Sequence, residues 1–333
     1  MDLNTLWFIL ITVLFTGFFI LEGFDYGVGM TLPFLDTEED RLMAIRSIAP
    51  VWDGNEVWMI TAGGALFAAF PHAYATMFSA FYLALFLMLF ALILRGAGLE
   101  LRGKDNNRLW RHGFDWAIAI GSALPALLWG VAVTNLLAGI AIDDHMIYQG
   151  TFWDLLRPYT LFGGLTFLLV FLFHGIAFLR LRIADERMTS SLLDGQRIIG
   201  ILAAFVFVIC GVMTLHDTDM TASVPAVIAL VLAAVTFLLS CLFSAVHACG
   251  KSFFMSTCAI ALTTIAFFLA LFPRIMVSTL GADLSLTIYN ASSTPYTLQI
   301  MTVAAGILVP IVLCYQAWSY YIFRKRVTRE DIA

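Results

Sequence analysis

Four carboxylic acids lie at the ends of two neighbouring apolar stretches, where charged side chains are unusual. Glu22 and Asp25 come near the end of the first stretch, and Asp53 and Glu56 near the start of the second. An acid inside a membrane helix costs about 2.5–3.5 kcal/mol or more, so its default explanation is functional. Because Asp53 and Glu56 share a helix face in a poorly hydrated place, one of them is expected to hold a proton. The pattern favours a proton relay.

Five more polar or aromatic residues are expected to support these acids. Trp52 and Asn55 flank them, Arg95 and Glu100 end the third apolar stretch, and Asp115 begins the fourth. Structural explanations remain open beside the functional one. Asp53 could cap a helix that follows Pro50, where the helix dipole favours a carboxylate. Arg95 could extend to the membrane surface as well as pair with the acids, and Glu22 and Asp25 could contact lipid headgroups.

The composition predicts the elements that must hold these residues. Hydrophobic residues make up 61% of the 333 residues and charged ones only 12%, with a mean hydropathy of +0.91. This is typical of a polytopic membrane protein, and no nucleic-acid partner is expected. The five cysteines include no CxxC pair, so disulfides and a thiolate metal site are not expected. The first basic residue is Arg41, so the first apolar run is predicted to be a helix that is retained.

About 20 apolar residues cross a membrane as a helix. Nine segments of the chain are long and apolar enough, and we expect one all-α membrane domain over residues 1–333. By residue number they are 5–29, 50–70, 74–95, 113–140, 158–179, 197–215, 222–246, 252–272 and 298–323. Only residues 71–73 separate the second from the third, so these two are predicted to form an antiparallel hairpin. Gly23 and Gly27, spaced by four, predict a close approach to another helix for the first segment alone.

The basic residues predict the orientation. With nine helices and the N-terminus outside, 16 of the 18 Lys and Arg fall on the inner side, leaving only Arg157 and Arg274 outside. This matches the bias of cytoplasmic loops toward Lys and Arg. The C-terminus is then inside, and the acids, Arg95, Glu100 and Asp115 all fall in the inner third of the first four helices. His174 is the one histidine well inside an apolar run, and packing explains it better than haem ligation. No cofactor or metal site is expected in this chain.

Several of these segments resemble subunit II of the bacterial cytochrome bd quinol oxidases. The matching segments are GFDYGVG at 23–29, SIAPVWDGNEVW at 47–58, ITAGGALFA at 60–68, FDW at 114–116, IGS at 120–122, NLLAG at 135–139, VPI at 309–311, AW at 317–318 and TREDI at 328–332. They run from the first helix to the last residues. The first two are long and unusual in composition, which makes them specific.

The resemblance implies two four-helix bundles, at about 5–140 and from about 158, plus one peripheral helix ending near 323. It implies a partner, the haem-bearing subunit I, which would carry two haems b, haem d and the site for quinol. The complex would oxidise quinol and reduce O2 to water in the bacterial cytoplasmic membrane, with protons taken from the cytoplasm. A small single-helix accessory subunit is a further partner that the resemblance allows, and a structural quinone in this subunit stays open.

By the same resemblance, Asp53 belongs to a proton path from the cytoplasm, and Asp25 and Glu56 are carried over beside it. The alternative is a stand-alone proton-coupled transporter or channel. Transporters tend to have broken helices near the midplane in matched halves. Here the polar residues gather at one face and in one half of the chain, which favours the oxidase subunit.

Overall fold

The computed structural model describes residues 2–332, and α-helices dominate it. The helices and the two short strands are α1 (Leu3–Thr31), α2 (Glu38–Ile48), α3 (Trp52–Ala69), α4 (Pro71–Ala80), α5 (Tyr82–Leu101), α6 (Arg108–Ala138), α7 (Pro158–Arg182), α8 (Glu186–Asp217), α9 (Val224–Ala245), α10 (Cys249–Leu271), β1 (Arg274–Met276), β2 (Leu286–Thr287) and α11 (Pro295–Ile322). Six short 3-10 turns join or extend them. The chain is an all-helical polytopic membrane protein, as its composition predicts.

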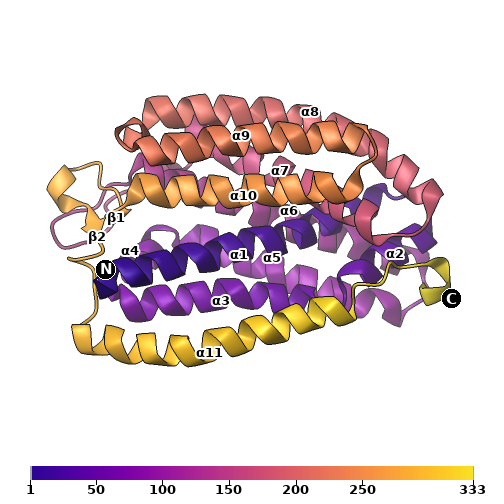
Figure 1. Ribbon diagram of the computed structural model, residues 1–333, viewed down its shortest axis with the longest axis horizontal. Helices are drawn as coiled ribbons and strands as arrows, with labels where there is room; N and C mark the ends of the chain where they lie inside the picture. The colour runs from indigo at the N-terminus through magenta and orange to yellow at the C-terminus, as the bar shows by residue number, and fades with distance from the viewer. Residues whose placement is uncertain (1, 333) are drawn as a thin grey trace.

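The long helices run roughly along one axis of the molecule (Figure 1). The N-terminus and the β1–β2 ribbon lie at one end of this axis, and α2 and the C-terminus lie at the other. Helix α11 runs along one edge, beside α1 and α3, and Leu298 is the one residue within it that is fully buried. The interior between α1, α6 and α7 is aromatic, with the rings of Phe19, Trp129 and Phe167 in edge-to-face contact.

Eight of the described helices are long and apolar enough to cross a membrane: α1, α5, α6, α7, α8, α9, α10 and α11. The ninth predicted segment, 50–70, corresponds to α3, which has 18 residues and falls outside this group. Its first two turns carry Asp53, Asn55 and Glu56, and these lower its mean hydropathy. A count of nine spans therefore requires that α3 also crosses the membrane, with its polar first turns shielded from lipid.

The boundaries predicted for the third segment were wrong. The residues 74–95 do not form one helix, because the helix breaks at Phe81. The ten residues of α4 follow Pro71, and the span itself is α5 with the turn after it, which extends to Lys104. The hairpin has the predicted direction, because Glu56 near the start of α3 contacts Arg95 near the end of α5. Hydropathy does not detect the break, since both sides of Phe81 are apolar.

Gly27 and Gly175 bring α1 and α7 into backbone contact. A Cβ atom built on Gly27 would lie 2.1 Å from the carbonyl oxygen of Phe171 and 2.6 Å from the Cα of Gly175. The predicted close approach of α1 is therefore confirmed. The restriction to α1 was wrong, because a Cβ on Gly130 of α6 would lie 2.3 Å from the carbonyl oxygen of Gly163 in α7. Two glycines on different helices can face each other whatever their separation in sequence, so a search for glycines spaced by four does not detect them.

One end of the molecule is closed by α2 and by the C-terminal residues (Figure 1). Thr37 and Asp40 form a capping box that starts α2. After α11, Val327 pairs with the strand-like residues that follow α7, donating its N–H to the carbonyl of Arg182 at 2.8 Å. Arg329 then binds Asp185 at 2.6 Å, at the start of α8. The end of the chain thus joins the α7–α8 junction and contacts α2.

Candidate functional site

Arg95 of α5 lies at the centre of a group of acids contributed by two other helices, α1 and α3. Its side chain is fully buried, and its Nη1 donates to Glu22 Oε1 in α1 and, at 3.1 Å, to Glu56 Oε1 in α3. The guanidinium lies 4.9 Å from the ring centroid of Tyr26 and 5.9 Å from that of Trp52. A buried charge is tolerated only when it is paired and hydrogen-bonded. Arg95 therefore holds α1, α3 and α5 together through charge.

Asp25 is fully buried in the same group but does not bind Arg95 directly. Its Oδ2 accepts a hydrogen bond from Asn55 Nδ2 at 2.6 Å. Asn55 Oδ1 in turn accepts from Tyr320 Oη at 2.8 Å and Gln316 Nε2 at 3.3 Å, both from α11. We call the set Glu22, Asp25, Asn55, Glu56 and Arg95 the acid cluster. Four helices therefore contribute to it or contact it.

The acid cluster contains more polar atoms than its side chains pair with one another. Five buried polar atoms in or beside the acid cluster have no hydrogen-bond partner among residues 2–332, and these are Glu22 Oε2, Asp25 Oδ1, Tyr26 Oη, Arg95 Nε and Arg95 Nη2. Buried polar groups are generally satisfied by protein or by water. Donors and acceptors both occur among these five atoms. The cluster therefore holds ionisable groups whose hydrogen-bonding capacity is not used up within the described residues.

A second charged group involves α2, and its nearest member in sequence, Arg102, comes seven residues after Arg95. Arg102 Nε donates to the fully buried Asp115 at 2.5 Å, and its Nη atoms bind both oxygens of Glu38 at 3.0 and 2.8 Å. Arg111 also binds Glu38, at 3.0 Å, and Arg41 lies 3.8 Å from Asp115. The bidentate pair of Arg102 with Glu38 is the strong form of an arginine–carboxylate ion pair. It joins α2 to the ends of α5 and α6.

Glu38 lies outside the membrane-spanning segments and makes the stability of this group depend on pH. Partial burial raises its pKa, but hydrogen bonds from Arg102 and the charges of Arg102, Arg111 and Arg41 outweigh this, so the pKa is below its ordinary value. A lowered pKa stabilises the folded state above the ordinary value, about 4.3, and this contribution is lost as the pH falls. We expect Glu38→Gln to lower the melting temperature near pH 7 and to matter less near pH 4.

The matched control for Glu38→Gln is Glu39→Gln, in the next residue of α2. Glu39 is more exposed and has only a 3.7 Å contact with Arg329, so its removal should have little effect at either pH. Melting temperatures of the purified assembly, measured from about pH 4 to about pH 8, test the difference. An equal effect of Glu38→Gln at both ends of the range would contradict the ion-pair explanation.

The other predicted site residues are separated by the structure. Asp53 lies on the exposed face of α3 and Glu100 on the exposed face of α5, and neither has a side-chain hydrogen bond or ion pair within residues 2–332. Asp115 belongs to the Arg102 group and not to the acid cluster. Sequence reasoning missed Tyr26, Gln316 and Tyr320. Gln316 was detectable as the one amide inside the last apolar segment.

His174, the histidine considered as a haem ligand, does not fit that role. His174 is buried, and both of its ring nitrogens face protein oxygens, Ser256 Oγ at 2.7 Å and the carbonyl of Ile20 at 3.3 Å. Its ring also stacks on Phe253. Across residues 2–332, no three His, Cys, Asp or Glu side chains come together in a way that could hold a metal ion. No step of the chemistry is therefore assigned to a haem in this chain.

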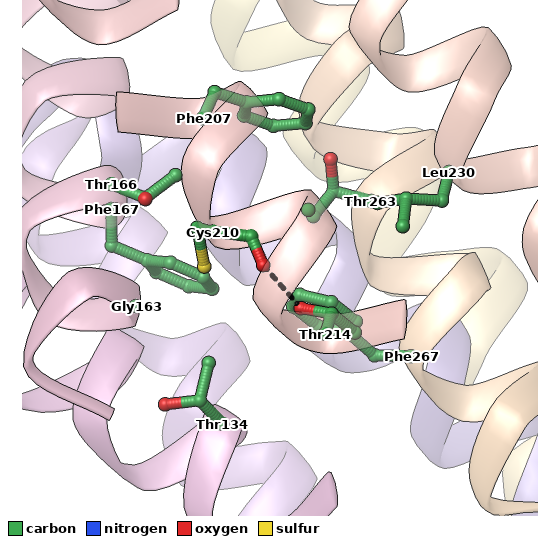
Figure 2. Close-up of a pocket in the computed structure, with 11 residues that line it drawn as sticks. Thr134, Gly163, Thr166, Phe167, Phe207, Cys210, Thr214, Leu230, Thr263 and Phe267 are labelled. Atoms are coloured by element: carbon green, nitrogen blue, oxygen red, sulfur yellow. Dashed lines mark hydrogen bonds between the residues drawn. The ribbon is translucent and has the colours of Figure 1, made fainter. Parts of the chain in front are cut away.

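A small apolar pocket of about 20 Å³ lies between α6, α7, α8, α9 and α10 (Figure 2). Its residues are Thr134, Gly163, Thr166, Phe167, Phe207, Cys210, Gly211, Thr214, Leu230, Thr263 and Phe267. Each threonine hydroxyl donates to a carbonyl of its own helix, as Thr214 does to Cys210 at 2.8 Å. The pocket therefore has no free hydroxyl donor, and it has room for about one water molecule.

Three known proteins with similar sequence or fold are all named as bd oxidases or their subunits. The chain is 41% identical to cytochrome bd ubiquinol oxidase subunit 2 of Bacillus subtilis, covering 99% of this chain and 98% of that one. It is 35% identical to cytochrome bd-I ubiquinol oxidase subunit 2 of Escherichia coli K12, covering 99% and 96%. Its fold matches a chain of the bd oxidase structure from Geobacillus thermodenitrificans with a TM-score of 0.77 at 16% identity, covering 98% and 100%.

The family model for cytochrome bd terminal oxidase subunit II matches residues 3–323, which is nearly the whole chain. Matches of this length do not favour a stand-alone transporter. They agree with the eight apolar helices of the described residues. The chain belongs to the family of cytochrome bd terminal oxidase subunits II.

Proposed function

We propose that this chain is the non-haem subunit of a quinol-oxidising, O2-reducing complex and that its acid cluster carries protons from the cytoplasmic side. The observation that supports this most is the burial of Glu22 and Asp25 beside Glu56 and Arg95, with unpaired polar atoms between them. A stabilising role alone would be served as well by apolar residues, because buried ion pairs contribute little net stability. Ionisable groups inside a membrane more often mark a path for ions or protons.

We propose nine spans with the N-terminus outside and the C-terminus inside. In this arrangement α3 is the ninth span, with its polar first turns covered by another subunit. The N-terminus and the C-terminus lie at opposite ends of the helix axis, which supports an odd number of spans (Figure 1). We further propose that α1, α3, α5 and α6 act as one bundle and α7 to α10 as a second, with α11 peripheral. The first bundle contains the acid cluster.

In the proposed path, Asp53 takes up the proton and Glu56 receives it. Asp53 is exposed on α3, near enough to Glu56 for their charges to interact. Beyond Glu56, Arg95 connects to Glu22, and Asp25 lies next along α1. A carboxylate cannot face lipid at acceptable free energy, so the face of α3 that carries Asp53 is expected to contact the partner subunit or water. Asp53 would thus deliver protons at the boundary between the subunits.

The partners follow from the same assignment. The haem-bearing subunit I is proposed to hold two haems b and a haem d, because the described residues of this chain offer no haem ligand. Quinol is the proposed electron donor, and the names of the Bacillus and Escherichia relatives support this. The lipid bilayer and a small single-helix accessory subunit are proposed as further contacts.

Asp53→Asn in the co-expressed complex tests the path. We expect quinol-driven O2 uptake to fall about 10- to 100-fold, while the reduced-minus-oxidised haem spectrum stays unchanged. Asp53 makes no side-chain contact within residues 2–332 that its loss would break. The control is Glu100→Gln, an exposed acid toward the same end of the molecule, which should leave uptake unchanged. Loss of the haems in Asp53→Asn would mean a role in assembly, and unchanged uptake would leave Asp53 as a carboxylate in the first turn of α3, where the helix dipole favours it.

A further inference from the structure

Helix α11 contacts the acid cluster through two polar side chains that the proposed path does not use. Gln316 and Tyr320 both bind Asn55 Oδ1, and Asn55 binds Asp25. We propose that a one-way chain of hydrogen bonds from Trp58 through Gln316 positions Asn55 and favours the ionised form of Asp25. Trp58, Gln316 and Tyr320 are then positioning residues, and their importance for turnover rests on the proposed function.

The direction of the chain is fixed by Trp58. An indole N–H can only donate, and it donates to Gln316 Oε1 at 2.9 Å. Gln316 must then present its Nε2 to Asn55, whose Oδ1 accepts it at 3.3 Å. Asn55 in turn presents Nδ2 to Asp25 Oδ2 at 2.6 Å. Each amide has one orientation that satisfies both of its neighbours, and Trp58 selects it.

A reversed chain is unfavourable at every link. If Asn55 turned its oxygen toward Asp25, its Nδ2 would face Gln316 Nε2, and two donors would meet. If Gln316 turned as well, its Nε2 would face the Trp58 N–H instead. Tyr320 adds a second donor on Asn55 Oδ1 at 2.8 Å. Asp25 Oδ2 therefore always faces a donor, which favours the carboxylate, and a proton on Asp25 is confined to Oδ1, which lacks a partner among the described residues.

Gly17 keeps Trp58 in place. A Cβ atom on Gly17 would lie 2.3 Å from the indole ring, so the glycine lets the six-membered part of the ring lie directly against α1. The indole N–H then faces α11. The start of the chain of hydrogen bonds is thus set by packing between α1 and α3, away from the acids.

Other charged and titratable groups also act on Asp25 and must be kept constant in a test. They are Glu22 from its own helix, Glu56 from α3, Arg95 from α5 and Tyr320 from α11. Trp58→Phe leaves all of these in place and removes the N–H donor together with one of the two fused rings that pack against Gly17. Tyr320→Phe removes only one O–H and keeps the ring, so it is the variant that changes packing least.

The experiment is an infrared pH titration of the whole oxidase complex. The protonated carboxyl band of Asp25 is assigned by its loss in Asp25→Asn. In Trp58→Phe and in Tyr320→Phe we expect the pH at which half of this band remains to rise by about one unit, since each variant weakens the donor that faces Asp25. A protonated carboxyl band of Asp25 that is absent from the parent and appears only in these two variants would also support the proposal.

Trp7→Phe is the matched control. Its indole also donates to α11, to Leu298 O at 3.3 Å and Thr302 Oγ1 at 3.1 Å, but at the opposite end of the helix. An unchanged midpoint in both test variants would overturn the proposal, and so would an equal shift in Trp7→Phe, which would indicate general loosening of α11. Normal turnover in Asp25→Asn would disprove only the proton path, because the titration judges the hydrogen bonds independently.

Discussion

Arg95→Met is expected to prevent assembly of the oxidase complex. The substitution leaves Glu22, which is fully buried, and Glu56 without the cation that both of them bind. Removing one partner of a buried ion pair destabilises proteins by about 3–5 kcal/mol, because the remaining charge has no compensation. The measurement is the yield of haem-containing complex from membranes with equal expression of the chain, together with its melting temperature.

The double variant Arg95→Met with Glu22→Gln separates charge from packing. It removes the buried carboxylate together with the cation, so we expect it to recover part of the yield that the single variant loses. Arg95→Lys should fall between the parent and Arg95→Met, because lysine keeps the charge but lacks the planar guanidinium that lies over the rings of Tyr26 and Trp52. A normal yield for Arg95→Met would show that the ion pairs do not hold α1, α3 and α5 together.

Gly27→Ala is expected to have an effect of similar size through a different cause. The added methyl group would overlap the carbonyl oxygen of Phe171, 2.1 Å away, and the backbone of Gly175. Backbone atoms cannot turn aside as side chains can, so α1 and α7 must separate. Overpacking of a core typically destabilises by about 1–3 kcal/mol, and this contact should reach the upper end. Thermal unfolding of the purified complex measures the loss.

Gly195→Ala is the control for Gly27→Ala. Gly195 lies in α8 with no atom of the described chain within 4 Å of an added Cβ. Alanine is the better helix former, so this substitution should leave stability unchanged or raise it slightly. If Gly27→Ala behaved like Gly195→Ala, the close crossing of α1 and α7 would not be required for stability.

The apolar segments and the family motifs predicted the class of the protein well. The prediction of a multi-pass subunit of a bacterial cytochrome bd oxidase, in the plasma membrane, was confirmed. The contacts within the acid cluster were less accessible. Arg95 was considered as a partner of Asp25, yet the hydrogen bonds of Arg95 go to Glu22 and Glu56. Hydropathy gives the depth of a residue along a helix but not the direction in which its side chain points.

Contacts between distant segments could not be predicted either, because hydropathy does not show which side chains face one another. Asn55 binds Gln316 and Tyr320, which lie more than 260 positions later in the chain. The second charged group depends on α2, a helix inside a linker that hydropathy describes only as polar. The break at Phe81 also cannot be seen in the hydropathy, because the residues on both sides of it are apolar. Helix packing decides each of these features, and packing depends on side-chain shape over the whole molecule.

The position of Gln316 and Tyr320 has a consequence for biosynthesis. The chain is made from the N-terminus, so α1 and α3 enter the membrane long before α11 exists. Until α11 is added, Asn55 Oδ1 lacks both of its donors and the indole of Trp58 lacks its acceptor. The tail that binds the α7–α8 junction is made later still. A chain that ends before residue 316 therefore leaves Asn55 and Trp58 of α3 without these hydrogen-bond partners. Cellular proteases can degrade such an incompletely folded subunit.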